Sequence, residues 1–177
     1  PVIENGMDTI YFCKDNAPLY IKAKDKNIYT TLTDIFWGEY ENGTKGDSLL
    51  ISENKNDMLY IAYSQNNYTT CVSDPDSIIV IVASPIETKT IGKNGTIELC
   101  VNEHINVMDT AKASFIIDKK RLSVIKYSIT ANGFDIVENE LADVTKTVQD
   151  TTNYVFTVKD ELTGCETTNK LRLIFHQ

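Results

Sequence analysis

The sequence predicts an all-β protein built from two tandem β-sandwiches, and three observations carry this prediction. The chain repeats itself once, its apolar residues follow the spacing of strands, and turn signals separate these stretches at short intervals. Its 177 residues suffice for one large or two small domains. Apolar residues make up 42% of the chain, which is enough for packed cores and too much for disorder.

The repeat is visible in matched stretches of the two halves. Asp8-Thr9-Ile10-Tyr11-Phe12-Cys13 aligns with Gly95-Thr96-Ile97-Glu98-Leu99-Cys100, and Tyr68-Thr69-Thr70-Cys71 aligns with Leu162-Thr163-Gly164-Cys165. The two cysteines are 58 residues apart in the first copy and 65 in the second, so the second copy carries a short insertion. We therefore expect one sandwich module at 1–84 and another at 85–177.

Strands are expected along both modules, because the apolar stretches are short, rich in β-forming residues and partly alternating. Four Asn-Gly pairs mark turns, since Asn-Gly tolerates the positive φ angles of tight hairpins. No window of a dozen residues has the apolar spacing of a helix. The expected strands lie near 8–13, 18–24, 33–40, 47–52, 57–64, 77–83, 95–101, 104–108, 113–118, 123–130, 134–139, 143–148, 153–159 and 168–175.

Two aromatic residues occupy the middle of expected strands. Trp37, the single tryptophan, lies in the first module, and Tyr127 takes the comparable place in the second. We interpret both as core aromatics over which the two sheets close. The alternative is an exposed platform for a ligand.

The four cysteines fall at equivalent positions, two in each module. Four cysteines allow three connectivities, and only Cys13–Cys71 with Cys100–Cys165 makes each module self-contained. We predict this pairing, with one disulfide in each sandwich. Metal binding would need clustered ligands at short spacings, and a catalytic thiol would need a nearby base, whereas the first module contains no histidine. Because disulfides persist in oxidising compartments, we expect the chain to be exported.

Each module resembles the immunoglobulin-like (PKD/CHU_C-type) repeats of Bacteroidetes cell-surface and gliding-motility adhesins. The resemblance rests on Thr96-Ile97-Glu98-Leu99-Cys100, on Trp37 or Tyr127, and on Asn153-Tyr154-Val155-Phe156-Thr157-Val158 before Leu162-Thr163-Gly164-Cys165. It implies that each disulfide ties an early edge strand to the start of the last strand. The chain departs from the pattern in having Thr70 before Cys71, where glycine is usual, and in lacking a tryptophan in the second module.

The same resemblance implies a glycoprotein. Secreted proteins of this phylum are O-glycosylated at Asp-(Ser/Thr) followed by an aliphatic residue, Met or Thr. The chain has five such motifs, where we expect roughly one by chance. The candidate O-glycosylation sites are Thr9, Ser48, Ser77, Thr110 and Thr151.

Three other groups of residues have plain structural interpretations. Asp74-Pro75-Asp76, with Asp57 and Glu53, could hold Ca²⁺, but a solvated turn is favoured because no spaced Asp-x-Asp-x-Asp-Gly loop is present. Lys119-Lys120-Arg121 is interpreted as the end of a hairpin. Five tyrosines of the first module could form a sugar-stacking face, although sheet and core positions are favoured; they are Tyr29, Tyr40, Tyr60, Tyr63 and Tyr68.

Composition and motifs together favour a protein without chemistry of its own. The net charge of −8 disfavours nucleic acid and anionic membranes as partners, and the longest apolar run is six residues. We expect no catalytic residue, cofactor or metal. The leading interpretation is a spacer or display fragment of a large secreted or cell-surface adhesin, with neighbouring repeats of the same chain as partners. The alternative is a dedicated glycan- or protein-binding module.

Overall fold

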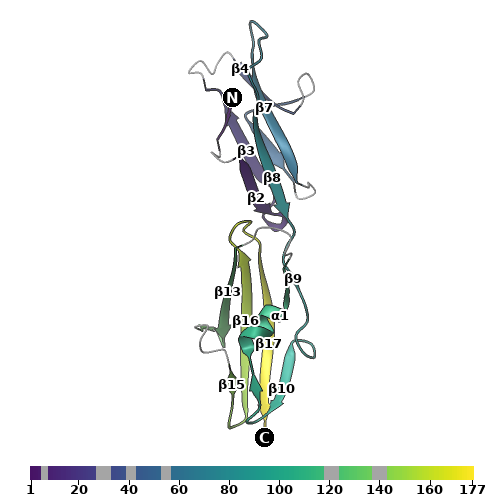
Figure 1. Ribbon diagram of the computed structural model, residues 1–177, viewed down its shortest axis with the longest axis vertical. Helices are drawn as coiled ribbons and strands as arrows, with labels where there is room; N and C mark the ends of the chain where they lie inside the picture. The colour runs from purple at the N-terminus through teal and green to yellow at the C-terminus, as the bar shows by residue number, and fades with distance from the viewer. Residues whose placement is uncertain (5–7, 27–32, 39–42, 53–56, 118–123, 137–142) are drawn as a thin grey trace. The chain divides into compact units, whose positions relative to one another are not determined.

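The computed structural model describes residues 1–4, 8–26, 33–38, 43–52, 57–117, 124–136 and 143–177. The chain divides into two compact units, which we call unit 1 (Pro1–Ser84) and unit 2 (Pro85–Gln177) (Figure 1). Strands dominate both units, and each unit has its own hydrophobic core. Each unit is therefore described by itself.

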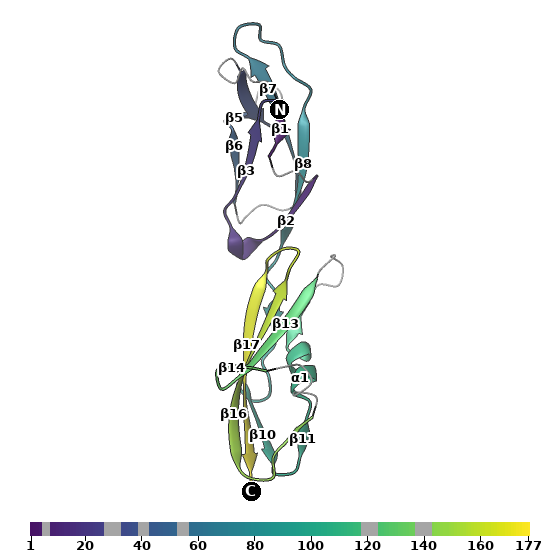
Figure 2. The ribbon, with the colours of Figure 1, turned by 90° about the vertical axis from the view of Figure 1, so that its left-hand side faces the viewer.

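Unit 1 consists of two sheets packed face to face (Figure 2). One sheet has the strand order β1-β3-β6, and the other has the order β2-β8-β7-β4-β5. Strand β2 runs parallel to β8, whereas the other pairings are antiparallel. The strands are β1 (Val2–Ile3), β2 (Thr9–Cys13), β3 (Leu19–Lys24), β4 (Thr33–Trp37), β5 (Thr44–Lys45), β6 (Ser48–Ile51), β7 (Met58–Asn66) and β8 (Asp76–Ala83).

The core of unit 1 forms where alternate residues of the two sheets face each other. In β8 the inward residues Ile78, Val80 and Val82 are buried, and Ile21 and Ile51 meet them from the opposite sheet. This explains half of the long apolar run of β8, because its inner residues fill the core. Its outer residues Ile79 and Ile81 are also apolar, although they face away from the core.

Unit 2 repeats the larger sheet of unit 1. Its strand order is β10-β17-β16-β13-β14, again with the first pair parallel. Two short pairings, β12 with β9 and β11 with β15, take the place of the smaller sheet. The strands are β9 (Glu87–Thr88), β10 (Thr96–Cys100), β11 (His104–Ile105), β12 (Phe115–Ile116), β13 (Ile125–Ala131), β14 (Phe134–Asp135), β15 (Val144–Thr145), β16 (Asp150–Asp160) and β17 (Glu166–His176).

Strands are present within both expected ranges, 104–108 and 113–118, but they are shorter than expected and a helix that was not predicted lies between them. Helix α1 (Val107–Ala113) separates β11 from β12, and it buries Val107, Met108 and Ala111 in the core. Asn106 caps it, because the Asn106 side chain accepts a hydrogen bond of 2.8 Å from the Asp109 N–H. The apolar contacts fill only two turns, too few for a periodic pattern to show in a dozen-residue window.

The two central aromatic residues both pack on a core, as predicted, but they do not occupy equivalent positions. Trp37 is buried, and its ring N–H donates a hydrogen bond of 3.1 Å to the Gly46 carbonyl. Trp37 lies opposite Ala62 in unit 1, and the matched pair in unit 2 is Ile129 opposite Phe156. Tyr127 is therefore not the counterpart of Trp37.

Tyr127 lies one inward position away from Ile129 and is only half-buried. It contacts Phe115 with a ring-centroid distance of 6.3 Å, and burial raises the pKa of its hydroxyl. In unit 2 the counterpart of Trp37 is the smaller Ile129, and Phe156, opposite it on β16, fills the corresponding volume of the core.

Candidate functional site

The outer face of the larger sheet of unit 1 is apolar, although it faces away from the core. Three aliphatic side chains on β7 and β8 are exposed by 38–54%: Leu59, Ile61 and Ile79. Leu59 and Ile79 lie directly opposite each other, so their side chains share one face. Monomeric proteins rarely expose contiguous apolar patches, and such patches commonly mark interaction sites.

Aromatic side chains continue this apolar face toward β4. Phe36 stacks on Tyr63 with a ring-centroid distance of 5.4 Å and an interplanar angle of 9°. Tyr11 on β2 adds a further half-buried ring opposite Ile81. We call this surface the apolar face; its members are Tyr11, Phe36, Leu59, Ile61, Tyr63, Ile79 and Ile81.

The matched face of unit 2 is polar, which makes the apolar face of unit 1 specific to that unit. Where unit 1 pairs Leu59 with Ile79, unit 2 pairs Asn153 with Arg172. The stacked Phe36 and Tyr63 are likewise replaced by the paired residues Ser128 and Thr157. The same framework therefore carries an apolar face in one unit and a polar face in the other.

The cysteines of unit 1 lie at opposite ends of its larger sheet. The parallel pairing of β2 with β8 sets Cys13 opposite Ala83, the last residue of β8. Cys71 precedes the first residue of β8, in the connection from β7. The strand between these ends spans roughly 20–25 Å at the usual rise, whereas a disulfide requires Cα atoms within about 7 Å.

Unit 2 separates its cysteines in the same way. Cys100 lies opposite His176, the last residue of β17, and Cys165 directly precedes Glu166, the first. This strand is longer still, at roughly 35 Å. Neither unit can therefore close a disulfide between its own two cysteines.

The predicted pairing of Cys13 with Cys71 and of Cys100 with Cys165 is accordingly wrong. Cys13 and Cys165 are the disulfide-bonded cysteines, and both are buried. Cys71 and Cys100 are free thiols, and both are exposed. The prediction of one disulfide within each sandwich assumed that the early strand ends beside the start of the last strand. That would require antiparallel strands, whereas β2–β8 and β10–β17 are parallel.

The two cysteines that precede the last strands sit in the same turn. In unit 1 the Asn66 N–H donates to the Cys71 carbonyl (2.9 Å), and in unit 2 the Asp160 N–H donates to the Cys165 carbonyl (2.8 Å). The residue before each cysteine has a positive φ, 59° at Thr70 and 74° at Gly164. Cys71 thus has the local structure of the bonded Cys165 without its bond.

Known proteins share the fold of this chain. The chain matches the solved structure of Sidekick-1 immunoglobulin domains 1–4 with a TM-score of 0.54 at 10% identity, covering 99% of this chain and 48% of that chain. A structure of Sidekick-1 immunoglobulin domains 1–5 matches with a TM-score of 0.51 at 10% identity, covering 99% of this chain and 38% of that chain. Both units are immunoglobulin-like β-sandwiches.

These likenesses show the fold alone. The chain spans less than half the length of the two solved chains. No known family matches the sequence, and no curated protein does so either. We refer to the two units below as immunoglobulin-like modules.

The acidic residues near the last strand of unit 1 hold backbone groups. The Asp76 carboxylate accepts hydrogen bonds from the N–H groups of Ile3 (2.8 Å) and Ser77 (2.9 Å), and Asp57 accepts one from the Val82 N–H (2.8 Å). Glu53 lies outside the described residues. Within the described ranges, no three His, Cys, Asp or Glu side chains come together as a metal site would require.

The candidate O-glycosylation sites have different surroundings. Ser48, Ser77 and Thr151 are exposed, and Thr9 is half-buried. Thr110 lies in α1 and donates its hydroxyl to the Asn106 carbonyl at 2.8 Å. The accessible hydroxyls of Ser48, Ser77 and Thr151 are thus the better candidates.

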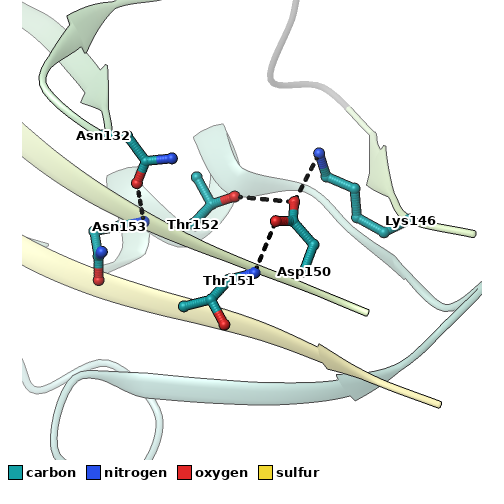
Figure 3. Close-up of polar contacts among 6 residues, drawn as sticks. All are labelled: Asn132, Lys146, Asp150, Thr151, Thr152 and Asn153. Carbon is teal, nitrogen blue, oxygen red and sulfur yellow. Dashed lines mark hydrogen bonds and ion pairs between the residues drawn. The ribbon is translucent and has the colours of Figure 1, made fainter. Parts of the chain in front are cut away.

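Asp150, which precedes Thr151, is held in place by several contacts (Figure 3). Its carboxylate forms an ion pair of 2.9 Å with Lys146 and accepts a hydrogen bond of 2.8 Å from the Thr151 N–H. The hydrogen bond with Lys146 is the main reason that the pKa of Asp150 is lowered. These contacts leave the Thr151 side chain pointing away from the carboxylate (Figure 3).

The remaining candidates do not gather at one place. Tyr63 is buried in the stack with Phe36, Tyr60 is half-buried with its hydroxyl pKa raised by burial, and Tyr68 is 80% exposed in a turn. Tyr29, Tyr40 and Lys119-Lys120-Arg121 lie outside the described residues. No helix in the described part of the chain is long and apolar enough to cross a membrane.

An open groove of about 530 Å³ lies at one end of unit 1, between β3, β4 and β5. Its charged side chains are of both signs, and two lysines of the lining are already paired with acids: Lys24 with Glu4, and Lys45 with Asp34. Such internal pairing leaves little net charge with which to select an ionic ligand. Sequence reasoning identified neither this groove nor the apolar face, because both depend on which strands become neighbours.

Proposed function

We propose that this chain is a non-catalytic pair of spacer modules from a larger secreted or cell-surface protein, and that it transmits tension along that protein. The observation that carries the proposal is the parallel pairing of the first long strand with the last strand in each module. This arrangement decides how a pull on the chain ends loads the sheet.

In unit 1, β2 is the first strand of the larger sheet along the chain and β8 is the last. Because these neighbouring strands are parallel, the start of β2 and the end of β8 lie at opposite ends of the pair. Tension between those points shears the whole hydrogen-bonded ladder, from Thr9–Ile79 to Cys13–Ala83, at once. An antiparallel pair pulled from one end would instead lose its hydrogen bonds one after another.

Unit 2 has the same geometry. Strand β10 pairs with β17 over five residues, from Thr96–Arg172 to Cys100–His176. Hydrogen bonds extend the ladder at both ends, from the Arg172 N–H to the Gly95 carbonyl (2.8 Å) and from the Val101 N–H to the His176 carbonyl (2.8 Å). A pull between the start of the first strand and the end of the last strand of the larger sheet therefore loads both modules in shear.

Further properties support an extracellular, non-enzymatic role. The disulfide-bonded Cys13 and Cys165 fit an oxidising compartment. The tyrosine pKa shifts come chiefly from burial, and that of Asp150 from its contact with Lys146, which are structural causes. The resemblance to Bacteroidetes gliding-motility adhesin repeats, and the exposed Ser48, Ser77 and Thr151 in their motifs, favour a glycosylated surface protein of that kind.

Single-molecule force spectroscopy on the full chain, held by its two ends under reducing conditions so that no disulfide closes a loop of the chain, tests the spacer function. Two proline substitutions in unit 2 form a matched pair, because each removes one hydrogen bond just beyond an edge strand. Val101→Pro removes the 2.8 Å bond to His176 in the parallel ladder, and Ile136→Pro removes the 3.0 Å bond to Ile129 in the β13–β14 hairpin. Both side chains are partly buried against the same core.

We expect Val101→Pro to lower the force at which unit 2 unfolds and Ile136→Pro to leave that force nearly unchanged, although both reduce equilibrium stability. Unfolding in urea, measured on the same variants, supplies the equilibrium comparison. Equal losses of force from the two substitutions would contradict the tension-bearing role of the parallel ladder.

The apolar face of unit 1 supports a second candidate function, the binding of a protein partner. Exposed Leu59, Ile61 and Ile79 present aliphatic surface without a converging set of polar groups, which suits a protein surface better than a glycan. Grafting the polar residues of unit 2, as Leu59→Asn with Ile79→Arg, would remove this surface. The control is Tyr20→Asn with Leu50→Arg, which alters an equally exposed apolar pair on the other sheet.

Binding to a glycan array and to a display library of extracellular protein domains decides between the ligand classes. We expect the unmodified chain to select protein domains, the Leu59→Asn/Ile79→Arg variant to lose at least tenfold in affinity for them, and the control pair to retain it. Selection of glycans, or equal losses in both variants, would contradict protein binding at the apolar face.

A further inference from the structure

The outer face of the larger sheet in unit 2 carries cationic and amide side chains. Arg172 of β17 lies between Thr96 of β10 and Asn153 of β16, so these three side chains share one row across the sheet. Lys170 precedes Arg172 by two residues and therefore lies on the same face of β17. The turn before β10 adds two further residues beside this row. We call the whole group the basic row; its members are Lys93, Asn94, Thr96, Asn153, Lys170 and Arg172.

Two open hollows in the surface of unit 2 meet at the basic row. They have volumes of about 590 and 480 Å³, and Asn94, Thr96 and Arg172 line both of them. Lys93 lines the larger hollow, and Lys170 lines the smaller one. A chain-like ligand that occupied both hollows would therefore contact Arg172 where they meet and one lysine in each.

The side chains of the basic row have no partners in the part of the chain that the structure describes. None of them forms an ion pair or a side-chain hydrogen bond with a described residue. Elsewhere on unit 2, Lys126 is neutralised by Glu161 at 2.6 Å. Glu98 lines the larger hollow, but its carboxylate already contacts the His176 ring at 3.3 Å. The basic row is thus a local excess of positive charge in a chain whose net charge is −8.

We propose that the basic row binds an extended acidic peptide segment of a partner protein. The Arg172 guanidinium can donate two parallel hydrogen bonds to one carboxylate of such a segment. Lys93 and Lys170 supply point charges for the carboxylates in the two hollows. The side-chain amides of Asn94 and Asn153 each offer a donor and an acceptor, which match the C=O and N–H groups of a peptide backbone.

The surroundings of the basic row favour a peptide over an acidic glycan. Tyr154 is the one aromatic residue that lines the two hollows, and it is 5% exposed and stacks on Phe156 in the core. A sugar ring would therefore find no aromatic face on which to lie. Half-buried Val155 and Ile174 provide aliphatic surface along which the methylene groups of glutamate side chains can pack. Clusters of arginine and lysine are a recurring means of recognising acidic peptide motifs.

The row at the matched position of unit 1 has lost this chemistry. Thr9 lies opposite Ile79, which lies opposite Leu59, so only the threonine is kept. The acidic-peptide site is therefore specific to unit 2. It is also separate from the apolar face of unit 1, and it does not depend on the spacer function.

Fluorescence anisotropy of a labelled hexaglutamate peptide, titrated with the full chain, tests the proposal. Arg172→Gln removes the guanidinium and keeps the backbone N–H that bonds to Gly95. Two lysine substitutions on the same face form a matched pair, with Lys170→Gln inside the basic row and Lys159→Gln outside it. Lys159 is six residues from Asn153 along β16, and so roughly 20 Å away. Both lysines are exposed, so neither substitution disturbs the core.

We expect hexaglutamate to bind the unmodified chain and Arg172→Gln to weaken this binding at least about tenfold, because a bidentate, charge-assisted contact is lost. Lys170→Gln should weaken binding about threefold, since it removes one exposed point charge. Lys159→Gln should change the affinity less than about twofold, because the solvent screens charges at that distance. Hexaglutamine keeps the peptide amides without the carboxylates and should bind much more weakly than hexaglutamate.

Failure of hexaglutamate to bind would overturn the proposal. Equal losses from Lys170→Gln and Lys159→Gln would do the same, because they would indicate attraction by the charge of the whole face. An oligogalacturonate of equal charge that bound as tightly as hexaglutamate would contradict the assignment to a peptide and indicate an acidic glycan. Thermal unfolding of each variant verifies that the fold is kept. The force measurement tests the spacer function separately, whichever result is obtained.

Discussion

The two modules share one framework and fill it with different side chains. At the centre of the core, Trp37 opposite Ala62 in unit 1 corresponds to Ile129 opposite Phe156 in unit 2. In unit 1 the large residue, Trp37, is on β4. In unit 2 it is Phe156 on β16, the strand that corresponds to β7, so the volume of the pair is kept although a different strand supplies it. The framework therefore determines the volume of the core that side chains must fill, but not which strand carries the large residue.

The outer faces differ far more than the cores. The row Leu59–Ile79 becomes Asn153–Arg172, a change from aliphatic to polar and charged side chains on the same pair of strands. Packing does not restrict these positions, because they are exposed. The turns that hold Cys71 and Cys165 are alike in both modules. The turns that carry Cys71 and Cys165 thus resemble each other more than the outer faces of the two larger sheets do.

The largest expected effect comes from exchanging the central pair. Trp37→Ile leaves a cavity beside Ala62 and removes the hydrogen bond to Gly46, and it should cost about 3 kcal/mol. Ala62→Phe alone overpacks the core and should cost about 2 kcal/mol. The double variant copies the pair of unit 2 and should cost clearly less than the two losses together.

Hydrogen exchange measured by mass spectrometry resolves this comparison, because peptides from β7 and β8 report on unit 1 and those from β16 and β17 serve as the internal control. If the loss of stability in the double variant equals the sum of the two single losses, Phe at position 62 does not fill the volume left by Trp37. The two modules then do not share one core volume.

The sequence could predict much of this framework, because the repeat, the strand spacing and the turns are all local signals. Asn94-Gly95 and Asn132-Gly133 have positive φ angles, as the Asn-Gly pairs predicted. Strand direction is not a local signal: alternation looks the same whether β2 runs parallel or antiparallel to β8, and the disulfide prediction failed at that step. Helix α1 left one sign, the capping pair of Asn106 with Asp109, which a search for caps would have found.

The residue before the cysteine turn gives the next largest effect. Gly164 has a φ of 74°, so Gly164→Thr should cost about 1–2 kcal/mol by forcing a β-branched residue into the left-handed region. Thr70 already occupies this region at 59°, and Thr70→Gly should therefore stabilise unit 1, by less than about 1 kcal/mol. Thermal unfolding of both variants checks the opposite signs, and two shifts of the same sign would show that the turns are not equivalent.

Helix α1 has no counterpart among the residues of unit 1 that the structure describes, and its cap offers a more local change. Asn106→Ala removes the acceptor for the Asp109 N–H and should cost about 1 kcal/mol. Hydrogen exchange should rise in α1 and leave β13 and β16 protected. Asn106→Asp keeps the acceptor and is the matched control, and equal losses in both variants would show that the cap contributes little.

The smallest effect concerns the ion pair of unit 2. The pKa of Asp150 is lowered mainly by its hydrogen bond with Lys146, so its carboxylate stabilises the folded state above the unfolded pKa of about 4. This contribution is lost as the pH falls through the lower folded pKa. Asp150→Asn should therefore be slightly less stable than the unmodified chain at pH 7 and equally stable near pH 2. A difference that persisted at pH 2 would have to come from the hydrogen bonds of Thr151 and Thr152 instead.

The central claim is that neither module forms a disulfide between its own two cysteines. Peptide mapping of the full chain, oxidised and then alkylated without reduction, tests it most directly. We expect Cys71 and Cys100 to be alkylated, and Cys13 and Cys165 to be protected from alkylation. Peptides joining Cys13 to Cys71 and Cys100 to Cys165 would contradict the claim and would require each early strand to end beside the start of the last one.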